Sequence, residues 1–178
     1  MATLYEMDAA NLFCDDLDPS NSQFLALEEV RIPALQEKTH EHTGGGAAMT
    51  MRMGMAVFEA LELTFKLRGI NPDVMNKIMT PGRSRKKYTI LGNVRDIEAA
   101  TEFSAKVVIE GRLTKVDMGT FSRDSGISTD YQVDEITHYE LWLNNQEKYY
   151  INVFRGPPGI RIDGAPVYAG MGRNLGLS

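Results

Sequence analysis

The sequence predicts a mainly β protein: two antiparallel sheets in a sandwich or barrel, with one short α-helix and a long extended loop. Two observations predict this fold class. Clusters rich in Gly, Pro, Asn, Asp and Ser recur along the chain, and these residues favour tight turns. Between the clusters, apolar and polar residues alternate with a period of two, which is typical of half-buried strands. The length, 178 residues, suits a single domain over residues 1–178.

The first part of the chain is expected to hold three strands and one arm. The strands are a short "NLF" at 11–13, then 23–32, and the alternating "LELTFKL" at 61–67. The arm covers residues 36–55 approximately, with the run Gly44, Gly45 and Gly46 as its tip. Glycine-rich backbone loses much entropy on folding, so the arm is expected to stay loose until another molecule orders it.

One short helix is predicted over about residues 72–80. Asn71 can cap it, Pro72 suits the first helical position, and Asp73 complements the helix dipole. Pro81 would stop its continuation.

Longer strands are expected in the second half of the chain. Residues 87–94 are expected to form a strand, residues 101–117 show a period of two that Val108 interrupts, and residues 129–154 read as a hairpin turning at "NNQE". Strands of this length are too long and too few for a dinucleotide-binding sheet.

The most unusual stretch is "THEHTGGGAAMTMRMGM", residues 39–55. It contains His40 and His42 and, at every second position, four methionines: Met49, Met51, Met53 and Met55. A copper or zinc site is one interpretation, because thioethers and imidazoles are metal ligands and histidines two apart on a strand share a side. Alternating methionines also form an adaptable apolar contact face, and this second interpretation is favoured. A phosphate-binding loop is disfavoured because no Lys-Ser/Thr follows the glycines.

Composition excludes several classes of protein. The net charge is −5, from 19 basic and 24 acidic residues, which argues against a surface that grips nucleic acid. Cys14 is the only cysteine, so no intrachain disulfide can form and a reducing cytoplasm is the expected place of folding. The N-terminus lacks the basic region of a signal peptide. No apolar run approaches the roughly 20 residues of a membrane span.

Catalysis finds little support in the sequence. Histidines occur only at positions 40, 42 and 138. Asp134 and Glu135 are adjacent, so on a regular strand they would point to opposite faces and could not work as a pair. We therefore expect neither an enzyme nor a bound cofactor or metal.

The order of these pieces resembles the major tail tube protein of contractile-tailed bacteriophages, found also in R-type pyocins. The pieces are the early "NLF", the exit "RIPAL" at 31–35, the Gly-rich arm, the helix at "NPDVM", two very long strands and the hairpin "LWLNNQEKYYINV". The terminal "RNLGL" at 173–177 is the most specific of them. The resemblance runs from about Asn11 to Leu177.

This resemblance implies a structural protein that assembles into hexameric rings, stacked into the inner tube of a contractile tail. The tube would be the conduit for DNA ejection and envelope penetration, and DNA would pass without specific binding. The implied partners are tail sheath, baseplate and tail terminator proteins. The implied place is the virion, after assembly in the bacterial host cytoplasm. A bacteriocin or type VI-like tube, or a monomeric β-barrel binding module, are the alternatives.

The resemblance also implies roles for particular residues. The arm would reach the adjacent ring, with Gly44, Gly45 and Gly46 as its pliant tip and the four methionines as its contact strip. The wall of the lumen tends to be acidic in this family. The candidate lumen-facing acids here are Glu102, Glu110, Asp130, Asp134 and Glu140.

Overall fold

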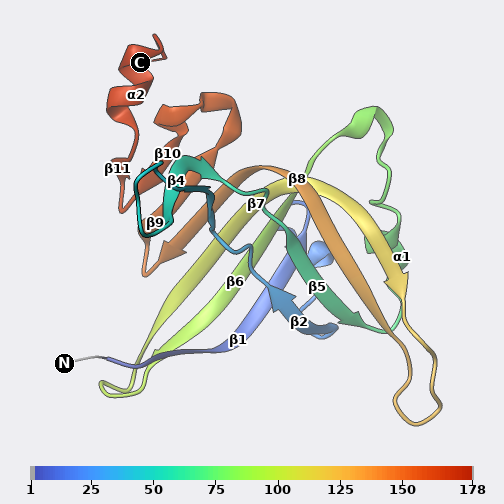
Figure 1. Cartoon of the computed structure of the whole chain (residues 1–178). Coiled ribbons are helices and arrows are strands. Elements are labelled where there is room, and N and C mark those ends of the chain that lie inside the picture. Colours follow the sequence, from blue (N-terminus) through green and yellow to red (C-terminus); the bar gives the residue numbers. More distant parts are fainter. Residues whose placement is uncertain (1–2, 178) are drawn as a thin grey trace.

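The computed structural model describes residues 3–177, and the mainly β fold class is confirmed (Figure 1). The strands are β1 (Tyr5–Cys14), β2 (Leu27–Arg31), β3 (Glu37–His42), β4 (Met51–Phe58), β5 (Leu63–Arg68), β6 (Lys86–Asp96), β7 (Thr101–Met118), β8 (Ser128–Leu143), β9 (Gln146–Asn152), β10 (Ile160–Ile162) and β11 (Ala165–Pro166). The α-helices are α1 (Pro72–Met75) and α2 (Ala169–Asn174). None of the helices within residues 3–177 is long and apolar enough to cross a membrane.

The strands form two antiparallel sheets. The larger has nine strands in the order β1-β6-β7-β8-β9-β10-β11, with β5 paired to β8 and β2 paired to β5. The smaller consists of β3 and β4, which among the described residues pair only with each other. We call this two-stranded element, with its loop at residues 43–50, the ribbon.

Strand β8 pairs with two different strands along one of its edges. Its first half, Ser128–Val133, pairs with β5, and its second half, His138–Leu143, pairs with β9. Because β7 occupies the other edge of β8 along most of its length, β5 and β9 share one edge. The sheet forks where Glu135 adopts a φ of 51°, a left-handed conformation that interrupts regular pairing.

A glycine on β7 makes this fork possible. A Cβ atom added at Gly111 would lie 2.8 Å from Val133 Cγ1 and 2.9 Å from the backbone oxygen of Asp134. Only glycine fits where the irregular part of β8 crosses so closely.

The core lies between the large sheet and the β5–β2 arm that folds over it. Residues from β1, β5, β6, β7 and β8 contribute the fully buried side chains Leu12, Leu63, Ile90, Ile109 and Val133. The ring of Phe65 stacks on that of Tyr131 with centroids 4.9 Å apart. The backbone N–H of Gln23 donates to the carbonyl of Leu12 over 2.9 Å, so the chain before β2 partly bridges the gap to β1. The body is therefore barrel-like and has open edges.

Four elements differ from expectation, and one of them is α2, a second short helix where the sequence predicted one helix in all. The helix spans only Pro72–Met75, not 72–80, because Ile78 forms a β-bridge with Leu113 and removes the following turn from the helix. The predicted cap is confirmed, since the side chain of Asn71 accepts from the N–H of Val74 over 3.2 Å. The first strand is longer than "NLF" at 11–13, and the expected loop at 36–55 is largely a hairpin.

Candidate functional site

The ribbon has two different faces. His40 lies directly opposite Met53, and His42 lies opposite Met51. Residues directly opposite each other in an antiparallel pair point to the same face. The two histidines and the two methionines therefore share one face, which we call the His/Met face.

The other face of the ribbon is polar and internally paired. Arg52 Nη2 lies 2.9 Å from Glu41 Oε1. The hydroxyls of Thr43 and Thr50 lie 2.8 Å apart. Because these groups satisfy one another, this face does not need a further partner.

The two remaining methionines of the predicted strip sit outside the regular pairing. Met49 lies in the loop with Gly44, Gly45 and Gly46, and Met55 lies in the irregular stretch after Gly54. All four methionines are exposed, at 79, 53, 39 and 46% from Met49 to Met55. The structure thus brings Met51 and Met53 onto one face and leaves Met49 and Met55 beside it. Their role in assembly stays a prediction.

The root of the ribbon is fixed by a bulge. Glu37 Oε1 accepts a hydrogen bond from the N–H of Ala56 over 2.7 Å, and Ala56 has a φ of 56°. A Cβ at Gly54 would lie 2.6 Å from the same carboxylate oxygen. Gly54 therefore allows the carboxylate to reach the backbone and to set the direction in which the ribbon leaves the body.

The candidate metal ligands in the described residues are side chains of the ribbon. Within residues 3–177, no group of three or more His, Cys, Asp and Glu residues is arranged to hold a metal ion. The soft-ligand set is thus limited to the two imidazoles and two thioethers of the His/Met face, all of them exposed.

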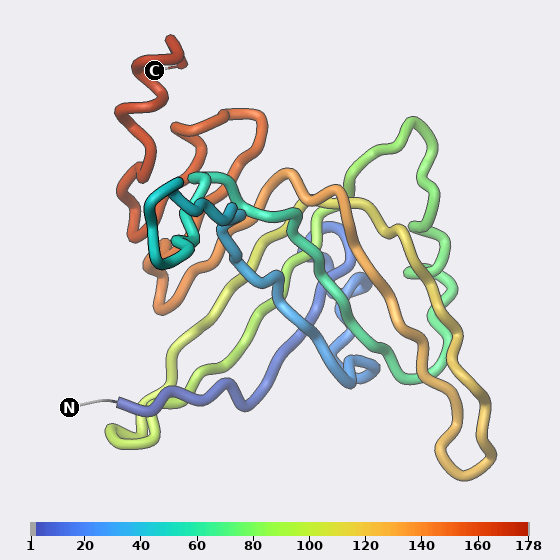
Figure 2. The backbone as a smooth tube through the Cα atoms, viewed as in Figure 1, coloured from blue at the N-terminus to red at the C-terminus, as the bar shows by residue number. Residues whose placement is uncertain are grey.

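An apolar groove of about 340 Å³ lies at the root of the ribbon. Its lining comes from the end of β4, from β9 and the turns after it, and from the C-terminal segment; it includes Val57, Phe58, Ile151, Val153, Tyr168 and Met171. No charged residue is among its described lining residues. Figure 2 shows the ribbon beside the C-terminal segment, as the lining requires.

The C-terminal segment contributes Tyr168 and Met171 to the lining of this groove, and the terminal "RNLGL" motif follows directly after them. A Cβ at Gly172 would lie 2.7 Å from Pro158 Cγ, so α2 packs closely on the turn at Pro157–Gly159. Gly176 has a φ of 70° after the end of α2, which suits glycine. Leu177 then turns back, with its Cδ1 within 3.3 Å of the Cβ position at Gly156.

A charged cluster beside the groove was missed by the sequence reasoning. Arg161 on β10 donates to both carboxylate oxygens of Glu147 on β9, over 2.9 and 2.7 Å. Its guanidinium lies 3.6 Å from the ring centroid of Tyr150. The hydrogen bond from Arg161 lowers the pKa of Glu147. Because β10 is too short to show a period of two, the sequence carried no signal for this pairing.

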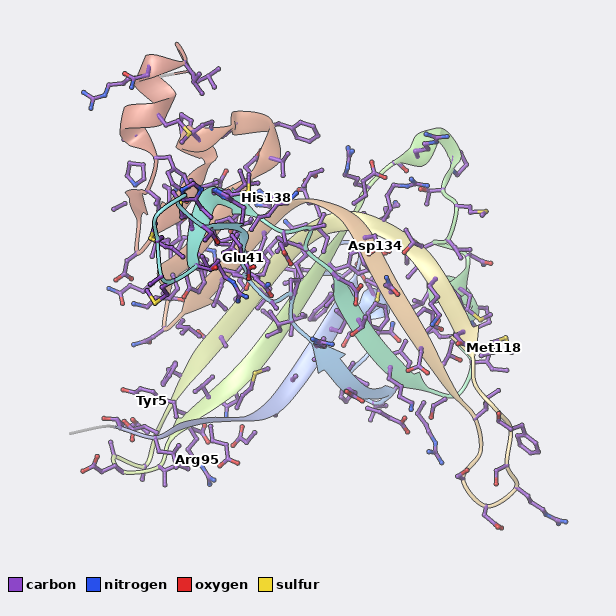
Figure 3. The ribbon with its side chains drawn as sticks, in the orientation of Figure 1. Tyr5, Glu41, Arg95, Met118, Asp134 and His138 are labelled. Carbon is purple, nitrogen blue, oxygen red and sulfur yellow. The ribbon has the colours of Figure 1, made fainter. Side chains whose placement is uncertain are left out.

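The predicted lumen-facing acids share the outer face of β7 and β8. Their strand neighbours Ile109, Tyr131, Val133 and Tyr139 are buried in the core, so Glu102, Glu110, Asp130, Asp134 and Glu140 point away from it. Figure 3 labels Asp134 and His138 on β8 and places Tyr5 and Arg95 at the distant end of the sheet.

Basic residues stand among these acids. Glu102 lies opposite Arg95, Glu110 opposite Lys87, and Asp130 opposite Lys66. Glu140 contacts His138 Nε2 over 2.7 Å and accepts from the indole N–H of Trp142 over 2.7 Å. The outer face is therefore mixed in charge and is not a uniformly acidic wall. That this face lines a lumen stays a prediction.

Glu135 departs from its expected position. A regular strand would have put it on the face opposite Asp134, but the bulge turns its carboxylate toward Arg112 and Arg85, at 2.9 and 2.6 Å. These arginines lower its pKa, chiefly through the hydrogen bond from Arg112. The ion pairs fasten the fork in β8 and do not make a catalytic pair.

Comparison with known proteins agrees with this geometry. Residues 5–176 match the family described as phage tail tube protein FII. No curated protein is significantly similar to the chain in sequence. Among solved structures, the sheath/tube terminator of an extracellular contractile injection system (PVC), in its extended state, has a TM-score of 0.50 at 15% identity and covers 76% of this chain and 92% of that one.

A second similar structure is the sheath–tube complex of the same kind of system, also in the extended state. Its TM-score is 0.47 at 16% identity, and the match covers 72% of this chain and 86% of that one. The terminator shows a shared fold and no more. The family match extends over nearly the whole chain, so this protein belongs to the phage tail tube protein FII family.

Proposed function

We propose that this chain is the repeating subunit of a contractile tail tube, in which six copies form a ring and rings stack along an axis. Membership of the tail tube family supports a structural role. The single observation that carries the stacked architecture is the ribbon, whose strands pair only with each other and whose His/Met face is exposed.

Open sheet edges support the ring. The large sheet ends at β1 on one side and at β11 on the other, and β2 ends the folded-over arm. Unpaired strand edges invite pairing with other chains, and closing a ring of copies removes them. Joining edges in this way would make the sheets of the ring one continuous inner wall.

The ribbon supports stacking. An isolated two-stranded hairpin is marginally stable in water and needs a third strand or a packing surface. Within residues 3–177 no third strand pairs with the ribbon, and its His/Met face stays exposed, so contact with a neighbouring ring would supply the missing surface. Stacking would then order the ribbon and become cooperative.

The proposed passage is lined by the outer face of β7 and β8. Its acids, Glu102, Glu110, Asp130, Asp134 and Glu140, would offset the basic residues among them and keep the wall from attracting phosphates. DNA would thus slide through without specific binding. An injection tube that carries no genome is the second candidate, favoured by that mixture of charges.

The proposed partners and location follow from this role. Tail sheath, baseplate and tail terminator proteins would be the partners, the bacterial host cytoplasm the place of assembly, and the virion the final location. The role requires neither catalysis nor a cofactor.

Sedimentation and negative-stain microscopy of the purified chain test the proposal. Rings or tubes should appear and grow with protein concentration, whereas a 19.9-kDa monomer at every concentration would contradict it. Deleting Gly44–Met49 should leave the β-rich circular dichroism spectrum and the rings intact and abolish stacking. Normal tubes from this deletion would refute the role of the ribbon and leave the ring untouched.

A further inference from the structure

We propose that the apolar groove at the root of the ribbon receives the His/Met face of the ribbon from a second copy of this chain in the next ring. The inference rests on the proposed function and adds to it the surface on which each ribbon docks.

The donor surface is one-sided. Charges on the polar face are neutralised within the ribbon by the pair Glu41–Arg52. The opposite face presents Met51 and Met53, which are 53 and 39% exposed. Thioether side chains are flexible and adapt to apolar surfaces. Only this face gains from leaving water.

The acceptor is apolar and held in shape before any contact. Its described lining is uncharged, so it suits thioethers better than the Glu41–Arg52 face. Behind it, the two-pronged contact of Arg161 with Glu147 ties β10 to β9. A Cβ at Gly159 would lie 2.4 Å from the carbonyl oxygen of Asn152, which shows how tightly this turn is packed. A preformed groove loses little conformational entropy on binding.

The ribbon cannot fill the groove of its own chain. Ala56, Val57 and Phe58 at the end of β4 form one wall of the groove, and the same strand continues outward into the ribbon. The hydrogen bond from Ala56 to Glu37 fixes that exit. To enter the groove, the strand would have to reverse immediately beside its own wall. A His/Met face that docks in this groove must therefore belong to another copy.

The contact between ribbon and groove joins two different surfaces. A contact of this kind does not close on itself, because one end of the stack always keeps a free ribbon and the other end a free groove. Repetition along one axis gives an open stack, which is the geometry that a tube requires.

Disulfide trapping tests the contact directly. Cys14 is the only native cysteine and is 1% exposed, so the background is low. Mixing the Met53→Cys protein with the Val153→Cys protein under mild oxidation should give a disulfide-linked dimer on non-reducing gels. The matched control is Arg52→Cys with Val153→Cys, because Arg52 lies on the polar face; it should stay monomeric on the gel. A Met53→Cys protein that instead links mainly to itself would overturn the proposal.

Charge exchange gives a second, independent test. Met53→Lys and Val153→Asp should each raise the protein concentration needed for stacking by about ten-fold or more. The two changes combined in one chain should restore most of the loss, because the new charges would meet across the contact. Circular dichroism identifies any variant that fails to fold.

The outcomes separate this proposal from the proposed function. Tubes that form normally with either single charge variant would overturn the groove contact while the tube role stands. A wild-type chain that never assembles would overturn both.

Discussion

The body and the ribbon of this protein differ in how far their paired strands are buried within one chain. In the body, β6, β7 and β8 pair along most of their length and bury Tyr88, Ile109 and Tyr139 almost completely. In the ribbon, β3 and β4 also pair, with a bulge at their root, yet every residue of β3 is exposed. In Figure 1 the ribbon stands with β9 to β11 and α2, away from the β7–β8 turn. The difference teaches that strand pairing alone marks neither a core nor independent stability; the body is complete in one chain and the ribbon is not.

The strongest way to sharpen this comparison is to truncate one apolar side chain in each region. Leu63 in the body is fully buried, so Leu63→Ala should lower the free energy of unfolding by about 2–5 kcal/mol. Met53→Ala in the ribbon should change it by less than about 0.5 kcal/mol in unassembled protein. Urea unfolding of dilute samples measures both, and equal losses would show that the ribbon is stabilised within its own chain.

Alkali should act on the body through its buried thiol. Burial raises the pKa of Cys14 from its ordinary 9.0 to about 12, and that of Tyr139 to about 12. Between pH 9 and 12 the unfolded thiol loses its proton while the folded thiol keeps it, so stability falls as the pH rises. The slope from Cys14 is about 1.4 kcal/mol per pH unit. Urea unfolding from pH 8 to 11 measures it.

A thiol in each region provides the control for this pH effect. Cys14→Ala should reduce the fall in the free energy of unfolding as the pH rises above 9. In Met53→Cys, the new thiol should react at once with a thiol reagent at pH 8, while Cys14 should react only on unfolding. Rapid reaction of Cys14 in the native protein would contradict the burial on which the pH effect depends.

Glycines offer a third contrast. Gly111→Ala would place a Cβ within 2.9 Å of the Asp134 carbonyl oxygen and should destabilise the body by about 1–3 kcal/mol. At Gly45 nothing lies within 4 Å of an added Cβ, so Gly45→Ala should change thermal unfolding by less than about 1 kcal/mol. A tolerated Gly111→Ala would mean that β8 is free to shift at the fork.

The last contrast concerns ion pairs. Glu147→Gln removes charge from the two-pronged contact with Arg161, and Glu147 is only 12% exposed there; a loss of about 1–3 kcal/mol is expected. Glu41→Gln in the ribbon, where the partners are 63 and 70% exposed, should cost less than about 0.5 kcal/mol. The hydrogen bond from Arg161 lowers the pKa of Glu147, so this stabilisation is lost as the pH falls. Chemical denaturation at pH 7 and pH 4 follows both effects.

Local pattern predicted those parts of the fold that are decided locally. Alternation over 101–117 and 129–154 led to β7 and to the β8–β9 hairpin, and the same parity placed the five acids on one outer face. The cap at Asn71 was also readable, because it involves only neighbouring residues. What failed there was the length of the helix, which Ile78 shortens through a contact with distant Leu113.

The rest depended on contacts between distant segments. Residues 39–55 suggested a loose arm because three glycines interrupt them, and the pairing of His40 with Met53 is visible only in the folded chain. The left-handed backbone of Glu135 is imposed by the pairing of β8 with two different strands. The groove joins residues 56–58 with residues 151–171, so no window of sequence contains it.

The continuity of β8 has a mechanical consequence. One covalent strand of 16 residues runs from the β5 side of the body to the β9 side, next to the groove. Backbone hydrogen bonds between antiparallel strands lie across the strand direction. A force applied to one end of the subunit along β8 would therefore load many hydrogen bonds in shear at once, instead of breaking them one by one. A tube subunit of this design would resist compression along β8 and transmit an end-on force with little deformation.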